Sequence, residues 1–294
     1  MSSFKKLVNR SVAGVRHFVH GVGFLIYGIL QSKKNRTIIC YPRTPWPLYT
    51  LWNMAQVCGF KLLKHPSQET NSPTILFQDI TIVNPESIPK EALTWINGRC
   101  LDIQKSTVAK IFTKAVQRDL QVNPMEYMGY MVEKSEKNPA HDGRIIKGPL
   151  QSSEEKAGYV YQRLINNLTK NNEIEDLRTV IVGSKIPLVY RIRRNQNEQF
   201  EGYGRCIEVI TADEAFSAKE QQELIECAQQ IGLDFGEMDV LRDQGDQMIY
   251  VVDINKTTVS PPADLCFKNQ IAALQKVGEA FEAEFGYITI NETS

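Results

Sequence analysis

Hydrophobic and polar positions alternate through much of the second half of the chain, which predicts β-strands joined by short turns. Two such stretches, 176–183 and 186–194, flank a glycine-containing turn, and another pair, 236–243 and 247–255, flanks a polar turn. Alternation places successive side chains on opposite faces of a sheet. The pattern therefore predicts antiparallel strand pairs in this part of the chain.

Helical periodicity appears between these strands. Ser217 and Glu220 have the spacing of a capping box before a helix over 218–233. Ser152 and Glu155 have the same spacing further upstream. Helices that lie between mostly antiparallel strands are typical of an α+β fold.

The region before residue 95 has a different pattern. Strands are expected over 36–41 and 73–80, with a helix over 48–64 between them. These elements predict a small α/β unit over 37–94, which ends in a loop rich in turn residues.

The N-terminal segment, 1–36, is amphipathic and basic. Its apolar residues recur at helical spacing, and 17–32 contains no Asp, Glu, Lys or Arg. This run is shorter than the roughly 20 residues that span a bilayer, and no small-residue cleavage site follows it. Two interpretations stay open: a helix lying in the interface of an anionic membrane, or a helix packed on its own domain or a second subunit.

Charge is distributed unevenly along the chain. Lys plus Arg and Asp plus Glu are both 34, but ten basic residues and no acidic one precede Glu69. The first 68 residues therefore carry about +10 and the remainder about −10. This favours a membrane surface, a nucleic acid or an acidic substrate as partner, or else a solvated basic face. The six cysteines include no CxxC pair, which is typical of reduced cytosolic thiols.

Oxygen-bearing side chains interrupt two of the predicted strands. Asp253 and Asn255 end the apolar run IYVVDI, and Asp239 lies in the preceding strand. If these strands pair as a hairpin, the three side chains converge. Two carboxylates and an amide oxygen suit a hard cation such as Mg²⁺, although strand-end capping is an alternative.

Cations also interrupt apolar strands, which costs desolvation energy unless an anion meets them. They are Lys134, Arg178, Arg191 and Arg193. Four cations near a Mg²⁺-type site favour a polyphosphate ligand. The alternative is that Arg178 pairs with Asp176 or another carboxylate and that the strand carrying Arg191 is half-exposed.

In this order and spacing, these pieces resemble the ATP-grasp superfamily, and most of all its ribosomal-protein and cofactor glutamate ligases. The likeness covers roughly residues 95–265 and rests on Lys105, Lys134, YQRL, DLRTVIVG, VYRIRR, GLDFGEMDV and YVVDIN. The resemblance implies an ATP-grasp fold of two antiparallel α+β lobes that clamp ATP. The predicted lobes are 95–157 and 158–294, and the small α/β unit precedes them.

The resemblance also implies roles for individual residues. The nucleotide-binding candidates fall into three groups. Lys105 and Lys134 match the phosphate-binding lysines, Gln162, Arg163 and Leu164 match the hinge that binds adenine, and Asp176 is a neighbouring acid. The catalytic candidates are Arg178 with Arg191 or Arg193. They match the cations that lie near the γ-phosphate and the acyl phosphate. The ligands of Mg²⁺ or Mn²⁺ are Asp239, Asp253 and Asn255.

The chain departs from the family pattern at several points. Asp253 stands where Glu is usual, and Glu237 stands where related ligases often have Arg. The flap over 135–143 is poor in glycine, and KTTVSPP follows Asn255 in place of a Pro-Gly turn that helps to form the acceptor pocket.

Together these features predict an ATP-dependent ligase that activates a carboxylate as an acyl phosphate for attack by an amine or another nucleophile. A kinase acting on a hydroxyl, or a nucleotide-binding protein without turnover, are the alternatives. Expected partners are ATP, an unknown substrate pair, an anionic membrane through 1–36 and a second copy of the chain, but not nucleic acid. The expected location is the cytoplasm, including the inner face of the membrane.

Overall fold

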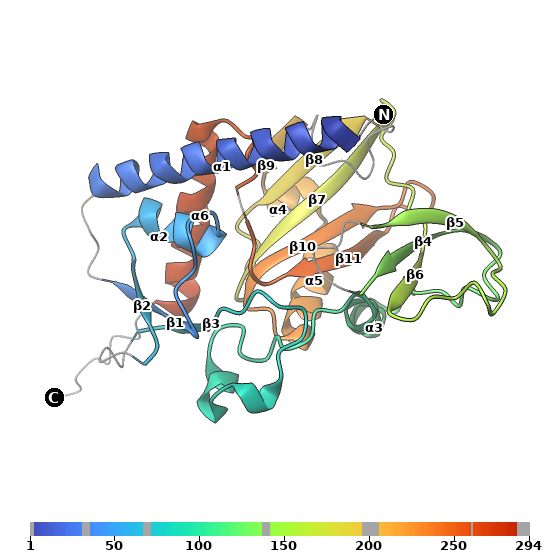
Figure 1. Cartoon of the computed structure of the whole chain (residues 1–294), viewed down its shortest axis with the longest axis horizontal. Coiled ribbons are helices and arrows are strands. Elements are labelled where there is room, and N and C mark those ends of the chain that lie inside the picture. Colours follow the sequence, from blue (N-terminus) through green and yellow to red (C-terminus); the bar gives the residue numbers. More distant parts are fainter. Residues whose placement is uncertain are drawn as a thin grey trace.

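The computed structural model describes residues 3–30, 36–66, 72–136, 142–195, 206–259 and 261–286. Within them, three β-sheets follow one another along the chain, with helices packed between and around them (Figure 1). Two of these sheets are antiparallel and one is parallel. The predicted α+β fold is therefore confirmed.

A long helix, α1 (Ser3–Leu30), runs along one side of the molecule (Figure 1). Phe24 is buried and stacks on Phe267 with ring centroids 5.2 Å apart. Gly28 lies against the backbone of Gln56, where a Cβ atom would come within 2.5 Å of the carbonyl oxygen. One face of α1 is thus packed on the chain's own domain.

The first sheet is parallel, and its central strand lies between two others that come later in the chain. Its strands are β1 (Thr37–Tyr41), β2 (Lys61–Lys64) and β3 (Thr74–Leu76), in the order β2-β1-β3. Two short 3₁₀ helices, η1 (Pro85–Ser87) and η2 (Lys90–Thr94), follow it.

Helix α2 (Thr50–Cys58) ends earlier than the sequence predicts. Gly59 adopts a left-handed conformation with φ 74°, and its N–H donates to the carbonyl of Ala55, which closes the helix. Residues 61–64 then pair with β1 as β2. The helix expected over 48–64 was therefore wrong in its last turn, because a single glycine redirects the chain.

The second sheet is antiparallel and follows helix α3 (Lys105–Val116). Its strands are β4 (Gly129–Ser135), β5 (Arg144–Gly148) and β6 (Tyr159–Arg163), in the order β5-β4-β6. The capping box expected at Ser152 and Glu155 does not form. No helix begins in this turn, and Glu154 accepts a hydrogen bond from the Gln151 N–H at 2.8 Å instead.

The third sheet is antiparallel and has the order β11-β10-β7-β8-β9. Its strands are β7 (Glu173–Val182), β8 (Val189–Asn195), β9 (Cys206–Ile210), β10 (Phe235–Arg242) and β11 (Ile249–Asn255). The helices of this region are α4 (Ala212–Ala215), α5 (Ala218–Ile231) and α6 (Phe267–Phe285). The capping box of Ser217 and Glu220 is confirmed at the start of α5.

One face of β7 changes character along its length. Val180 and Val182 belong to a buried cluster with α2 and α6, whereas Asp176 and Arg178, on the same face, line a cavity. On the opposite face of β7, Leu177 and its neighbours pack against helices α3 and α5. Both faces of the sheet are therefore covered, and the polar half of one face is left to form a site.

Asn97 joins the loop before α3 to the start of β10. It is fully buried, its side-chain oxygen accepts hydrogen bonds from the N–H groups of Asp234 and Phe235, and its amide donates to the Phe235 carbonyl at 2.7 Å. It also has a left-handed φ of 60°. This residue fixes the N-terminal part of the chain against the third sheet.

Replacing Asn97 by Ala is expected to lower the free energy of unfolding by about 3 kcal/mol, because it leaves buried backbone groups unpaired. Asn172→Ala is the matched control, since Asn172 also has positive φ, at 58°, but is exposed. Urea denaturation of both variants measures the difference. Equal losses in the two variants would mean that backbone conformation, and not the buried hydrogen bonds, accounts for the effect.

Candidate active site

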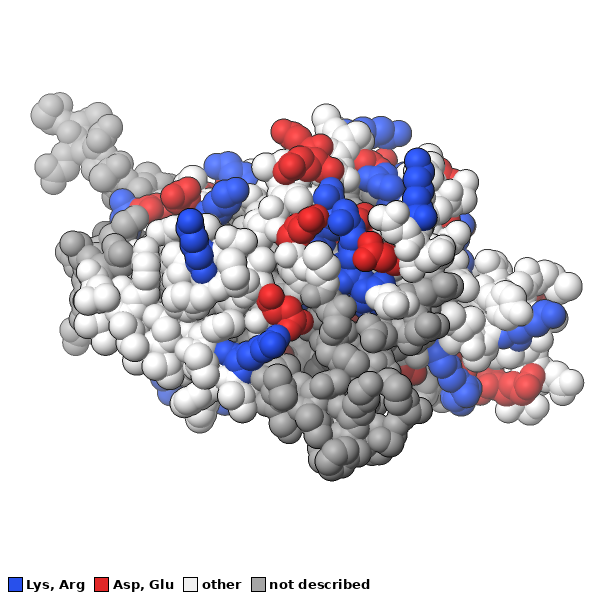
Figure 2. Space-filling view, turned by 90° about the horizontal axis from the view of Figure 1, so that it is seen from above, with Lys and Arg blue, Asp and Glu red and all other residues white. Residues whose placement is uncertain are grey.

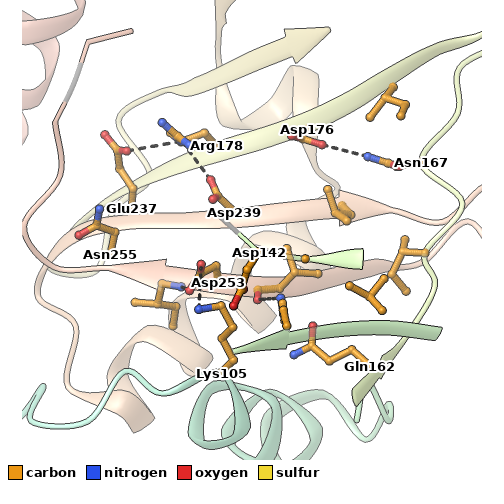
Figure 3. A pocket seen from close by; sticks show the side chains of 18 of the residues that line it. Lys105, Asp142, Gln162, Asn167, Asp176, Arg178, Glu237, Asp239, Asp253 and Asn255 are labelled. Carbon is orange, nitrogen blue, oxygen red and sulfur yellow. Dashed lines mark hydrogen bonds and ion pairs between the residues drawn. The ribbon is translucent and has the colours of Figure 1, made fainter. Parts of the chain in front are cut away.

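A cavity of about 560 Å³ lies between the second and third sheets and reaches the N-terminal unit. Its lining includes ten of the twelve residues that the sequence singled out (Figure 3). They are Lys105, Lys134, Gln162, Arg163, Leu164, Asp176, Arg178, Asp239, Asp253 and Asn255. The strands and helix that carry them are separate in sequence and meet only in the fold.

The three proposed metal ligands come from the hairpin of β10 and β11. Asp239 lies directly opposite Asp253, and Glu237 lies opposite Asn255, so four oxygen-bearing side chains share one face. Figure 3 shows them on neighbouring strands at the same end of the cavity. The expected convergence of the three side chains on one face therefore occurs.

The donor set fits a hard cation that shares its ligands with a bound anion. Among the described residues, no group of three His, Cys, Asp or Glu side chains is placed to hold a metal alone. Mg²⁺ commonly takes one or two carboxylates and completes its shell with phosphate oxygens and water. Two carboxylates and an amide oxygen match that requirement.

Arg178 balances the negative charge of this set. Its Nε donates to Asp239 Oδ1 at 3.0 Å and lies 3.7 Å from Glu237 Oε2. The charge of Asp239 raises the pKa of Arg178 further above its ordinary value. The guanidinium is therefore permanently charged at the metal end of the cavity.

Two lysines approach the same end from α3 and β4. Lys105 Nζ is 3.9 Å from Asp253 Oδ2, and Lys134 Nζ donates to the Val252 carbonyl at 2.8 Å. Burial and, to a smaller extent, the charge of Lys105 lower the pKa of Lys134 to about 8, while the charge of Asp253 opposes this shift. Burial raises the pKa of Asp253, while both lysines oppose this. Lys105 and Lys134 concentrate positive charge at this end of the cavity, and a bound anion would relieve the repulsion between them.

The predicted hinge lies at the other end of the cavity. Gln162 is buried, and its Nε2 has no hydrogen-bond partner among the described residues. Arg163 points to Tyr250, donating to its hydroxyl at 2.8 Å and lying 4.8 Å from its ring centroid. With Leu164 and Ile165, these residues form a mixed apolar and polar wall.

The structure does not bring Arg191 or Arg193 into this cavity. Both side chains lie on the other face of β8, where they pair with Glu175 and Glu208. Because side chains alternate along a strand, the next residue, Arg194, faces the cavity instead.

Arg194 pairs with Asp176, whose carboxylate also accepts from Asn167 Nδ2 at 2.9 Å. The sequence reasoning missed Arg194, although counting the alternation from Arg178 through the β7–β8 register identifies its face.

Further lining residues come from the N-terminal unit, from the predicted flap and from the KTTVSPP segment, and only those of the N-terminal unit carried no sequence signal. Tyr49, Asp79, Thr257 and Val259 close one end of the cavity, and Asp142 and Gly143 lie at its edge. Tyr49 and Asp79 come from the N-terminal unit, far from the other residues in sequence. The predicted flap, 135–143, is described only at its ends, so 137–141 lie outside the described residues.

Lys134 gives the protein a specific pH response. Its pKa is about 8 in the folded protein and about 10.4 in an unfolded chain. Between these values the unfolded chain binds a proton that the folded protein lacks, so folding stability rises with pH. Relative to Lys134→Met, the wild type should gain about 2 kcal/mol of unfolding free energy from pH 7.5 to pH 9.5. Urea denaturation at both pH values measures this; parallel changes in the two proteins would contradict it.

No protein-family model and no curated protein sequence matches the chain. Solved structures do. The ATP-grasp ligase PsnB, complexed with a phosphomimetic variant of its minimal precursor, Mg and ADP, aligns over 87% of this chain and 100% of its own, with 13% identity and a TM-score of 0.50.

Two further structures align less well. PsnB with its minimal precursor aligns over 62% of this chain and 60% of its own, with 18% identity and a TM-score of 0.41. The macrocyclase MdnC with precursor peptide MdnA, from Microcystis aeruginosa MRC, aligns over 83% of this chain and 98% of its own, with 13% identity and a TM-score of 0.44.

At such identities the comparison concerns the fold alone. The alignment with PsnB spans most of this chain and all of PsnB, so it covers the whole architecture of that ligase. The chain has the ATP-grasp fold.

Proposed function

We propose that this protein is an ATP-dependent ligase that activates a carboxylate as an acyl phosphate for attack by an amine or another nucleophile. The observation that carries the proposal is the meeting of the Asp239–Asp253 pair with Lys105 and Lys134 in one cavity. Carboxylates and cations lie together at one end of the cavity, and a wall of apolar and polar residues lies at the hinge end. This combination suits a nucleotide polyphosphate. The presence of Mg and ADP in the PsnB structure supports the same ligands here.

Each group has a defined task in this proposal. Lys105 and Lys134 bind phosphate oxygens, and the backbone of 162–164 contacts adenine. Asp239, Asp253 and Asn255 hold Mg²⁺ (or Mn²⁺), which would neutralise charge on the phosphates when bound.

Gln162 offers a buried amide donor without a described partner, which supports a hydrogen-bonding ligand at the hinge end. Asp176 orients Arg194 beside this space.

Arg178 is the cation best placed for the transferred phosphoryl group, since it lies beside Asp239. Charge spreads over the oxygens of that group as the bond to ADP breaks, and a fixed guanidinium stabilises it. We assign the second cation to Arg194, because Arg191 and Arg193 face away from the cavity. No nucleophilic side chain is needed for this chemistry.

The first test is nucleotide binding. MgATP at about 100 times its Kd should stabilise the wild type by about 2.7 kcal/mol. Asp253→Ala should remove most of the magnesium-dependent part, because it deletes one of the opposed carboxylates. Thermal unfolding with ATP plus Mg²⁺ and with ATP plus EDTA measures both effects. Asp119→Ala is the control, since Asp119 is exposed and outside the cavity.

Turnover with pooled amino acids and small peptides then separates three functions. Phosphate release that requires both a carboxylate and an amine supports a ligase. Phosphate transferred to a hydroxyl compound without an amine indicates a kinase. Nucleotide binding without release of phosphate in any mixture indicates a protein without turnover, and no binding rejects all three. Peptides belong in the screen because PsnB binds a precursor peptide.

We also propose that the protein is cytoplasmic and contacts an anionic membrane through α1. The face of α1 turned away from the domain carries exposed apolar side chains: Val15, Phe18, Val19, Val22, Leu25, Ile26, Ile29 and Leu30. Viewed from this side, the left part of the molecule is largely white in Figure 2. Among the described residues, no helix has both the length and the apolar character to cross a membrane.

Charge favours lipid over a second copy of the chain on this face. Basic residues stand at both ends of the segment in sequence, and no acidic residue occurs before Glu69. Pairing two α1 helices in either direction would bring like charges together, whereas anionic lipid head groups neutralise them. An apolar face between basic ends suits a helix lying in the membrane interface.

Replacing Phe18 and Ile29 together by Glu should abolish flotation with vesicles that contain phosphatidylserine. These side chains are 68% and 71% exposed, so the fold is expected to tolerate the change. Met128→Glu is the control, because Met128 is 81% exposed but lies elsewhere. Wild-type flotation should fall with pure phosphatidylcholine and at high salt. Equal flotation of all variants, or a wild-type dimer lost in the double variant, would contradict membrane contact.

A further inference from the structure

Asp79 is held by two hydroxyl groups at the end of the cavity nearest the N-terminal unit. The Tyr49 hydroxyl donates to Asp79 Oδ2 at 2.6 Å, and the Thr257 hydroxyl donates to Oδ1 at 2.8 Å. Tyr49 packs edge-on against Phe77, with ring centroids 5.1 Å apart. We call Tyr49, Asp79 and Thr257 the Asp79 cluster; it fixes a carboxylate at the cavity surface.

Asp79 is the acceptor in both hydrogen bonds. Burial, followed by the hydrogen bond and charge of Asp79, raises the pKa of Tyr49 to about 12, so its hydroxyl stays protonated and donates. Thr257 is neutral. An ionised carboxylate has about four acceptor positions, and two neutral donors leave the others for a ligand.

A short chain of contacts connects this cluster to the proposed metal ligands. The Thr257 N–H donates to Asn255 Oδ1 at 2.9 Å, and its hydroxyl donates to Asp79. Thr50, next to Tyr49, donates through its N–H to the Thr258 carbonyl at 2.8 Å. The cluster is therefore adjacent to the end of the cavity where phosphoryl transfer is proposed.

Charge distinguishes this end from the rest of the cavity. Lys105, Lys134 and Arg178 gather around the proposed metal ligands. Asp79 makes no ion pair within the part of the chain that the structure describes. Asp79 is exposed, so water solvates its carboxylate until a ligand binds. A carboxylate or phosphate at Asp79 would be repelled, whereas an ammonium group would form an ion pair with it.

Two other cations lie in the vicinity but do not neutralise Asp79 by contact. Arg43 is exposed and acts on Tyr49 through its charge. Lys256 is buried and donates to the Cys100 carbonyl at 3.0 Å, so it acts on Asp79 through its charge and not by contact.

We propose that the Asp79 cluster is the binding subsite for the amine that attacks the activated carboxylate. The Asp79 carboxylate binds the ammonium form of the acceptor, Thr257 and Tyr49 hold that carboxylate in place, and Val259 contacts the apolar part of the acceptor. The bound ammonium group loses one proton to solvent, which reaches the exposed Asp79. The free amine then attacks the acyl carbon, inorganic phosphate leaves, and the nitrogen loses a second proton as the amide forms. This inference rests on the proposed ligase function and specifies its nucleophile as a primary amine. Asp79 is a binding residue here and takes no part in phosphoryl transfer.

The experiment uses full-length protein with MgADP and two pools of matched probes. One pool contains amides of the amino acids with uncharged side chains, which carry an α-ammonium group and no carboxylate. The other contains the corresponding N-acetyl amino-acid amides, which lack the ammonium group. Saturation-transfer NMR measures probe binding, and thermal unfolding with and without MgADP reports nucleotide binding in the same samples.

The wild type should bind members of the ammonium pool, and the N-acetyl pool should give no signal. Asp79→Asn should reduce binding by at least about tenfold, which is the effect of losing about 1.4 kcal/mol from one charged hydrogen bond. Tyr49→Phe, which keeps the carboxylate, should retain preference for the ammonium pool. Asp119→Asn is the control for a lost surface charge and should match the wild type.

The outcomes distinguish this inference from the proposed function. If MgADP binds but the ammonium pool does not, or binds equally to Asp79→Asn, the subsite is refuted while the ligase proposal stands. If MgADP does not bind, the proposed function fails first. Loss of stability in Asp79→Asn with unchanged preference for ammonium would show that the cluster only joins the two parts of the fold.

Discussion

The arrangement of the site depends on one irregularity in the hairpin of β10 and β11. Asp239 pairs with Asp253, but Val240 pairs with Val251, so the register passes over Val252. Such a bulge bends a strand and redirects its side chains. Val251 faces the buried core with α3 and α5, whereas Asp253, two residues on, faces the cavity.

The bulge has a second consequence at Val252. A residue left out of the regular ladder has a carbonyl that needs another partner. Lys134 Nζ donates to the Val252 carbonyl, which ties β4 of the second sheet to β11 of the third. The same irregularity thus turns Asp253 into the cavity, opposite Asp239, and anchors a lysine nearby.

Charge balance explains why the cavity tolerates so many ionised groups before any ligand arrives. Arg178 lies between Asp239 and Glu237, Lys105 approaches Asp253, and Arg194 pairs with Asp176. Each acid therefore has a cation close by, which offsets the cost of desolvation. Glu237 adds negative charge where related ligases often have Arg, and Arg178 is the cation that compensates for it. The Asp79 cluster is the exception, since neutral hydroxyls hold its carboxylate.

The α+β class, the strands that form the hairpins and ten residues that line the cavity could be predicted from the sequence alone. Period-two alternation and polar residues at strand ends are local properties of the sequence, so they can be identified without knowledge of the fold. The tertiary structure decided which face each strand presents and which distant segments meet. It excluded Arg191 and Arg193 from the cavity and admitted Arg194, because one residue of alternation reverses a side chain. It ended α2 at Gly59, and it brought Tyr49 and Asp79 to Thr257 through contacts between segments that no local pattern connects.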